Sequence, residues 1–237
     1  MSFNLSNCKY DFASDNINIF VNIYDMSSSM EDDIGKMQNA NRIFYDEFMG
    51  FEEKGSIAIA KAVFADGFEM GAFRDIKDFN TGYRAYGNTA LYNAIIQTAK
   101  NTIAYYNEIV KRLNVRPRIT FLVFSDGGDN IGTTSDYNKA KEMIKQLNSL
   151  DATTVFVAFR GAIANEDGKR LGFTCTKDIK DAKDLSICMG KELSRSCREQ
   201  SKSAYSLKSE FFSKADKNSN EDKLQDQLIN DDELFDI

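Results

Sequence analysis

The chain contains no histidine and only four cysteines, and both facts restrict its chemistry. Without histidine, it can form no His-ligated zinc site, no Ser-His-Asp triad and no Cys-His pair. The cysteines show no CxxC spacing, so zinc held by cysteines alone is not expected. We predict free, buried thiols in a reducing compartment rather than disulfides. The four are Cys8, Cys175, Cys188 and Cys197.

Long apolar segments and an excess of basic charge are also missing. No apolar run is long enough to cross a bilayer, and residues 1–10 have neither a basic start nor an apolar stretch. We therefore expect no membrane span, no signal peptide and a cytoplasmic location. The net charge is −6, and residues 221–237 alone hold seven acids and one lysine. The remaining residues are balanced in charge, which argues against binding to nucleic-acid phosphates.

Strand-like apolar segments alternate with helical patterns along most of the chain. Between these segments, apolar residues recur at three- and four-residue steps, as in amphipathic helices. The alternation predicts an α/β fold with a doubly wound, mainly parallel sheet and helices on both faces. Asp66-Gly67 predicts a tight turn into residues 68–76, and hence a hairpin. The expected strands are residues 17–25, 56–66, 119–124, 153–159 and 173–176, and the expected helices are 30–48, 91–110, 137–147, 161–172 and 181–203.

The composition divides the chain into three parts. Residues 1–15 are polar and irregular, and residues 16–203 carry the alternating pattern of one α/β domain. Residues 204–237 form a polar, acidic tail that we expect to be flexible. Apolar residues among the acids of this tail favour an alternative in which it folds onto a partner.

A carboxylate and two hydroxyls follow the first predicted strand. Asp25 ends that strand, and Ser27 and Ser29 stand at alternate positions of the loop that leads into a helix. In open α/β sheets, ligands bind at the carboxyl ends of the strands. These side chains offer hard oxygen ligands, which suit Mg²⁺, Mn²⁺ or Ca²⁺. The alternative is that Asp25 and the serines cap the next helix.

Three short motifs resemble those of the von Willebrand factor A-type (VWA) domain. They are DxSxS from Asp25, GNTAL from Gly87 and FSDGG from Phe124, in this order. The resemblance covers the strand and helix order of residues 16–203. It implies a Rossmann-like, mainly parallel sheet of six strands with one antiparallel edge strand. Asn88 departs from the pattern, because many members of the family have a second glycine there, and this affects loop shape more than ligation.

In that family these residues form the metal-ion-dependent adhesion site (MIDAS). The resemblance implies hydroxyl ligands from Ser27, Ser29 and Thr89, and direct or water-mediated binding by Asp25 and Asp126. Neutral hydroxyls leave Mg²⁺, or Mn²⁺ or Ca²⁺ in its place, under-neutralised. A carboxylate of a partner protein can then complete the shell, and a low local dielectric strengthens that bond. We therefore predict a metal-dependent protein-binding module.

The resemblance also implies a type of partner. Intracellular members of the family often work beside AAA-type ATPases as metal-bridged adaptors. The segment 162–203 is more similar to bacterial or phage stand-alone members than to integrin inserts. We expect a protein partner, possible membership of a stress or phage complex, and neither nucleic acid nor a membrane as partner.

Two other functions stay open. A bound Mg²⁺ could activate water for hydrolysis. However, Ser27 stands where phospho-aspartyl hydrolases carry a second Asp, and Asp126 is assigned to the metal, so no acid/base is evident and we predict no enzymatic activity. A scaffolding protein would keep the fold and use the metal only to order its loops.

Overall fold

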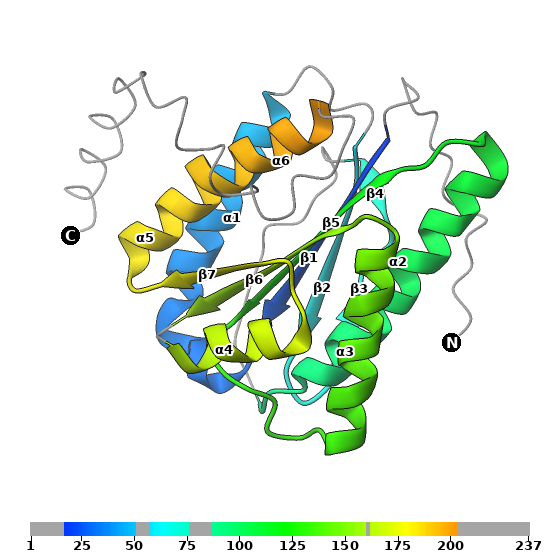
Figure 1. The fold of residues 1–237 in the computed structure, drawn as a ribbon. Helices are drawn as coiled ribbons and strands as arrows, with labels where there is room; N and C mark the ends of the chain where they lie inside the picture. The colour runs from blue at the N-terminus through cyan, green and yellow to red at the C-terminus, as the bar shows by residue number, and fades with distance from the viewer. Residues whose placement is uncertain (1–16, 51–56, 76–86, 160–161, 203–237) are drawn as a thin grey trace.

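The computed structural model describes residues 17–50, 57–75, 87–159 and 162–202. Figure 1 draws the other residues as a thin grey trace. The expected N-terminal extension at 1–15 and the expected tail at 204–237 lie outside the described residues. The division of the chain into one domain and two extensions therefore stays a prediction.

A single mixed sheet runs through the middle of the domain (Figure 1). The strand order is β3-β2-β1-β5-β6-β7, and β4 also pairs with β2. Strands β2, β1, β5, β6 and β7 are parallel, whereas β3 and β4 run antiparallel to β2. The predicted mainly parallel sheet is confirmed, with its antiparallel edge divided into two short pieces. The strands are β1 Asn18–Asp25, β2 Ile57–Phe64, β3 Phe68–Met70, β4 Arg74–Asp75, β5 Arg118–Ser125, β6 Thr153–Phe159 and β7 Cys175–Ile179.

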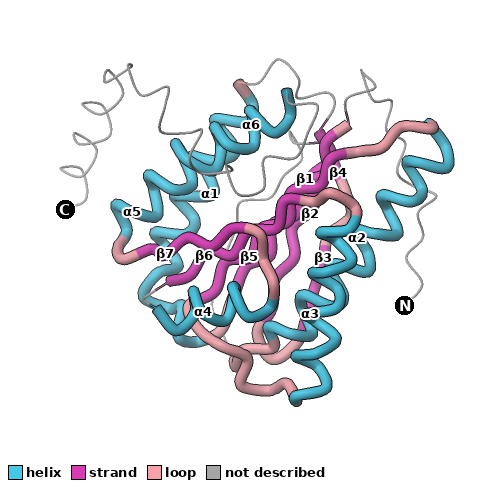
Figure 2. Tube along the Cα trace, in the orientation of Figure 1, coloured by secondary structure: helices cyan, strands magenta, loops and turns pink. Residues whose placement is uncertain are grey.

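Helices cover both faces of the sheet, as Figure 2 shows. Residues of α2 and α3 pack on one face, and residues of α1, α5 and α6 pack on the other. The helices are η2 Ser28–Asp33, α1 Ile34–Met49, α2 Leu91–Leu113, α3 Thr134–Ser149, α4 Ala162–Leu171, α5 Ala182–Ile187, η5 Cys188–Leu193 and α6 Ser194–Lys202. Within the described ranges, we find no helix with the length and apolar character needed to cross a membrane.

The first strand shows why the sheet is placed centrally. All of β1 is buried. Its residues Ile19, Val21 and Ile23 pack against α2 and α3, whereas Phe20 and Tyr24 pack on the α1 side. A parallel strand that is covered on both faces is typically rich in apolar residues, and β1 has a run of them at residues 19–21 and again at Ile23. Because the strand is fixed by packing on both faces, the polar residue at its end, Asp25, has a fixed position at the edge of the sheet.

Three element boundaries differ from the sequence predictions. The helix expected from residue 30 begins as the 3₁₀ turn η2, and α1 starts only at Ile34. The last strand is Cys175–Ile179 rather than 173–176, and the ring of Phe173 before it packs edge-on against Phe156, 5.3 Å away between centroids. The closing helix contains a π-helical stretch, η5, between α5 and α6. The described cysteines are free and buried, as predicted, and Cys8 lies outside the described residues.

Candidate metal centre

Asp25 ends β1 at the carboxyl edge of the sheet, beside the end of β5. Its side chain is fully buried. The main-chain N–H of Ser27 donates to Asp25 Oδ1 at 2.8 Å, and the Ser125 hydroxyl donates to Oδ2 at 2.5 Å. Both carboxylate oxygens thus have one donor each, from the loop after β1 and from the neighbouring strand. Each oxygen keeps a further lone pair for another ligand.

The environment of Asp25 disfavours its negative charge. Burial raises the pKa of its carboxyl group to about 6, although hydrogen bonds from Ser125 and Ser27 lower it. The negative charge of Asp126 adds to the increase in this pKa. A buried carboxylate beside a second carboxylate gains most from a nearby cation. The electrostatics of the site are therefore those of an anionic position that a cation would stabilise.

Ser27 and Ser29 form a chain of hydrogen bonds to Asp126. The two serine hydroxyls lie 3.0 Å apart, and Ser29 Oγ donates to Asp126 Oδ1 at 3.0 Å. Ser27 is buried, whereas Ser29 is exposed. Ser27 occupies the N-cap position of η2 with an extended backbone, but its side chain makes no capping hydrogen bond. The helix-cap alternative therefore does not describe Ser27, whose hydroxyl faces Ser29 instead.

Thr89 is brought to the same edge by its main chain. Its N–H donates to Asn130 Oδ1 at 2.8 Å, and its C=O accepts from the Asn130 N–H at 3.1 Å. Thr89 is only 5 % exposed, and its hydroxyl makes no hydrogen bond to the described part of the chain. The Gly87 C=O accepts both from Ser28 N–H at 2.9 Å and from Ser28 Oγ at 3.0 Å. Thr89 is thus tied to the loop after β5 and, through Gly87, to the serine loop.

The turn before Thr89 depends on Gly87 and Asp66. Gly87 has a φ of 74°, and a Cβ at this position would collide with the Asp66 carboxyl group. Asp66 Oδ1 accepts from the Asn88 N–H at 2.9 Å and from its Nδ2 at 2.6 Å. The carboxamide of Asn88 therefore stabilises the turn by its hydrogen bond to Asp66, at the position where the motif often has glycine. This departure from the pattern concerns loop shape.

Sequence reasoning missed three residues that position this edge. Ser125 binds Asp25, and Asn130 binds Thr89. Asp129 accepts from the N–H of Tyr92 at 2.6 Å, from that of Ile131 at 2.9 Å, and from a further loop N–H. Asp129 thereby caps the start of α2, which has no side-chain cap of its own. In the sequence, only their position marks them: Ser125, Asp129 and Asn130 lie in the polar segment around Asp126, the predicted metal ligand that follows β5.

The five predicted ligands come from three connections at one edge of the sheet. Hydrogen bonds link Asp25 to Ser27, Ser27 to Ser29 and Ser29 to Asp126. In the described part of the chain, Thr89 reaches this group only through main-chain hydrogen bonds. All donors are oxygens, and hydroxyls outnumber carboxylates. Within the described ranges there is no cluster of three or more His, Cys, Asp or Glu side chains that could hold a metal. The residues fit a hard divalent cation only if the hydroxyls take part.

No protein-family model matches the sequence, and no curated protein matches it. Solved structures do share the fold. The pilus adhesin SpaC from Lactobacillus rhamnosus GG matches with a TM-score of 0.59 and 11 % identity, over 78 % of this chain and 30 % of SpaC. PTMP1, a proximal thread matrix protein from the mussel byssus, matches with a TM-score of 0.56 and 14 % identity, over 74 % of this chain and 46 % of PTMP1.

Two further matches lie in the same range. A structure of PTMP1 described as having a zinc-occupied MIDAS motif matches with a TM-score of 0.54 and 13 % identity, over 73 % of this chain and 46 % of that one. The PilB minor pilin from Streptococcus sanguinis, in a mutant form, matches with a TM-score of 0.56 and 9 % identity, over 78 % of this chain and 62 % of PilB. This chain thus spans less than two thirds of each of these proteins. At these identities the likeness concerns the fold alone.

Proposed function

We propose that this chain, which has a von Willebrand factor A-type fold, is a metal-dependent protein-binding module. In this proposal Ser27, Ser29 and Thr89 offer hydroxyls to a divalent cation, and Asp25 and Asp126 offer carboxylates. The cation is Mg²⁺, with Mn²⁺ or Ca²⁺ as alternatives. The hydrogen-bonded group of Asp25, the two serines and Asp126 is the observation that carries the proposal.

The charges of these residues favour capture of an acidic partner. Asp25 is buried with a raised pKa, and a bound cation would offset this cost. Asp126 is half-buried and already accepts a hydrogen bond from Ser29. The remaining ligands are neutral hydroxyls, which would neutralise little of the ion's positive charge. When bound, the ion supplies an electrophilic position that a carboxylate of another protein can occupy.

The structural relatives support both the bound cation and the binding role in this proposal. PTMP1 carries a MIDAS motif that is described as occupied by zinc, which makes a divalent cation at the corresponding edge reasonable. SpaC is described as a pilus adhesin, which is a binding role. Zinc is therefore a further candidate for the bound ion, beside Mg²⁺, Mn²⁺ and Ca²⁺. No catalytic step is part of the proposal.

Calorimetric titration with MnCl₂ tests the metal site. The wild-type chain is expected to bind Mn²⁺, and Asp25→Ala and Ser29→Ala are expected to lose this binding. Ser28→Ala is the matched control, because Ser28 lies between two proposed ligands but its hydroxyl donates to the Gly87 C=O. It should bind Mn²⁺ nearly as well as the wild type. Equal binding by the Asp25 variant would refute the proposal.

A capture experiment tests the binding function. The chain is immobilised and exposed to extract of its source cell, once with Mg²⁺ and once with EDTA, with Asp25→Ala as control. A partner that is retained only by the wild type with Mg²⁺ supports the proposal, and its identity shows whether it belongs to an AAA-type ATPase complex. A Ser27→Ala chain that stays folded, binds no ion and still assembles normally would favour the scaffolding alternative.

A further inference from the structure

Asp167, an acidic residue of α4, lies close to the loop that follows Asp126, the proposed metal ligand after β5. A Cβ added to Gly128 would stand 2.9 Å from Asp167 Oδ2. Gly128 is two residues beyond Asp126 in the chain. Asp167 comes from a different part of the sequence, and only the packing of α4 on the sheet brings it here. The Asp167 carboxylate therefore belongs to the border of the proposed metal site.

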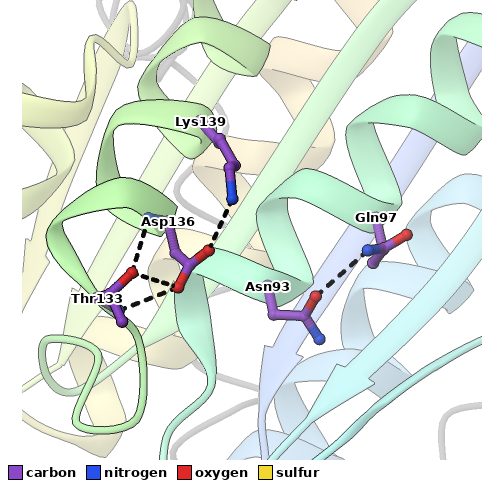
Figure 3. A network of polar contacts seen from close by, with 5 residues as sticks. All are labelled: Asn93, Gln97, Thr133, Asp136 and Lys139. Carbon is purple, nitrogen blue, oxygen red and sulfur yellow. Dashed lines mark hydrogen bonds and ion pairs between the residues drawn. The ribbon is translucent and has the colours of Figure 1, made fainter.

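Asp167 forms no ion pair in the described part of the chain, whereas Asp136 and Glu166 each pair with a lysine. Figure 3 shows Asp136 engaged by Thr133 and Lys139, at the start of α3. Glu166 binds Lys169 at 2.8 Å. For Asp167 there is no hydrogen bond or ion pair within the described ranges, and none joins it to a lysine or arginine of its own helix. Its side chain is partly buried and free to meet a positive charge from outside.

An aromatic and apolar surface adjoins this carboxylate. Tyr92, in the first turn of α2, is half-buried and packs edge-on against Tyr137, 5.6 Å away between ring centroids. A Cβ at Gly132 would stand 2.8 Å from Tyr92 Cδ2, so the loop after β5 lies against this ring. Burial, followed by the charges of Asp167 and Asp129, raises the pKa of Tyr92, whereas the positive charge of Arg170 lowers it. The Tyr92 N–H also donates to Asp129 Oδ2 at 2.6 Å, so the start of α2 is fixed beside this loop.

Ile131 completes this surface. Its side chain is 49 % exposed, and it is one of two large apolar side chains exposed to this degree in the described part of the chain. The main-chain N–H groups of Ile131 and Tyr92 both donate to the Asp129 carboxylate, so the two residues flank the same side chain. We name the surface made of Tyr92, Ile131 and Asp167 the α4-side rim. It combines an aromatic ring, an aliphatic side chain and an unpaired carboxylate next to the metal site.

We propose that the α4-side rim binds a lysine or arginine side chain of the same partner segment whose carboxylate reaches the metal. The partner motif would then be an acidic residue with a basic residue nearby, rather than a run of acids. This inference rests on the proposed function and specifies its partner class. The carboxylate of Asp167 would pair with the cationic head, Tyr92 would offer its ring, and Ile131 would contact the aliphatic stem.

The same charges disfavour a purely acidic partner. Asp167 and Asp129 stand beside the proposed site, so a second acid next to the metal-bound carboxylate would meet like charge. Exposed ion pairs are weak, and we expect the basic residue to improve affinity about two- to fivefold. The rim therefore acts on selection among acidic partners more than on affinity. This preference should decline as salt is added, because the pair is accessible to solvent.

An NMR titration of the full chain with Mg²⁺ and synthetic peptides tests the inference. Each peptide carries one Glu in a Gly-Ser background, with an Arg placed one to four residues to either side. A matched peptide has Gln in place of each Arg. We expect at least one Arg spacing to bind the wild type two- to fivefold more tightly than its Gln counterpart. Shifts should appear in Ile131 and the first turn of α2.

Variants of α4 separate this inference from the proposed function. Asp167→Asn should remove the preference for Arg while Mg²⁺ and the Gln peptides bind as before. Glu166→Gln is the matched control, since Glu166 already pairs with Lys169, and it should keep the preference. If every Arg peptide binds the wild type no better than its Gln counterpart, or if Asp167→Asn keeps the preference, the inference is wrong and the metal-binding proposal stands. If no peptide binds although Mg²⁺ does, acidic-partner capture fails as well.

Discussion

The hydroxyl of Ser125 donates a 2.5 Å hydrogen bond to Asp25 Oδ2, between the ends of two adjacent parallel strands. The Ser27 N–H donates to the other oxygen of the same carboxylate at 2.8 Å. Asp25 is consequently held in one orientation by groups that are far apart in sequence. These two donors lower its pKa but do not overcome the effect of burial. The fold thus fixes the orientation of a buried carboxylate whose negative charge it disfavours.

Without metal, the stability of the chain should fall as the pH rises from 4 to 6. The pKa of Asp25 is about 6 in the folded chain, against an ordinary value of 3.8 for an aspartate. In this window the folded state binds more protons than the unfolded state, so the free energy of unfolding decreases with pH. The decrease in the free energy of unfolding is absent below pH 3.8, is complete above pH 6 and amounts to about 3 kcal/mol. Urea unfolding in EDTA between pH 4 and pH 7.5 measures it.

Asp25→Asn should lose this pH dependence, because asparagine does not titrate. Asp46→Asn is the matched control, since the Asp46 side chain is 59 % exposed. It should keep the wild-type slope between pH 4 and pH 6. Identical slopes for the wild type and the Asp25 variant would show that another group is responsible.

The affinity for Mn²⁺ should depend on the same proton. A metal ligand has to be deprotonated, so metal and proton compete for Asp25. Below its pKa of about 6, the apparent affinity should fall about tenfold for each pH unit, whereas above pH 7 it should be nearly constant. Calorimetry between pH 5 and pH 8 gives the profile. An affinity that does not change between pH 5 and pH 7 would exclude Asp25 as a ligand.

Ser125→Ala should weaken metal binding without removing a ligand. The substitution deletes the hydrogen bond that lowers the pKa of Asp25 and fixes its orientation. Loss of such a supporting contact typically costs about 10- to 100-fold in metal affinity. The pH at which Mn²⁺ binding declines should also move upward. A Ser125→Thr chain retains a hydroxyl and is expected to recover part of the affinity, so equal losses in both variants would point to a packing effect.

Gly87→Ala should destabilise the domain by about 1–3 kcal/mol, because its φ of 74° is unfavourable for alanine and the methyl group would meet Asp66. The matched control is Gly35→Ala, in the first turn of α1, where nothing lies within 4 Å of the added Cβ. Alanine there should be neutral or stabilising, by up to about 1 kcal/mol. Urea unfolding of both variants at one pH checks the difference, and similar changes in stability would contradict it.

The central strands could be predicted closely from the sequence. β6 spans residues 153–159 as expected, and β1 begins one residue later than expected. Both strands are covered on both faces, so they are rich in apolar residues and were recognisable as strands, although Asn22 interrupts the apolar run of β1. The edge strand β7 was displaced because Thr174 pairs with Thr154 through side chains before the strand begins. The π-helical stretch η5 was not predicted, because the helical pattern runs through it without interruption, and in the structure it packs against α1.

For the candidate site too, the sequence predicted some features and the structure alone showed others. The sequence motifs named Asp25, Ser27, Ser29, Thr89 and Asp126, and the structure brings their connections to one edge. Whether they bind a metal stays a prediction. The motifs did not reveal that Asn130 holds Thr89 by both main-chain groups, or that Asp129 caps α2. These contacts join segments that are distant along the chain, and a residue type alone does not specify its partner.

The order of strands and helices was determined by the sequence itself, because hydrophobic periodicity is a local property that each segment carries with it. The identity of the polar residues at the strand ends was likewise evident from the motifs. The tertiary structure alone decided which of them meet: Ser125 with Asp25, Asn130 with Thr89, and Asp167 with the loop at Gly128. The physical reason is that strand register and helix packing set distances between side chains that local sequence does not constrain.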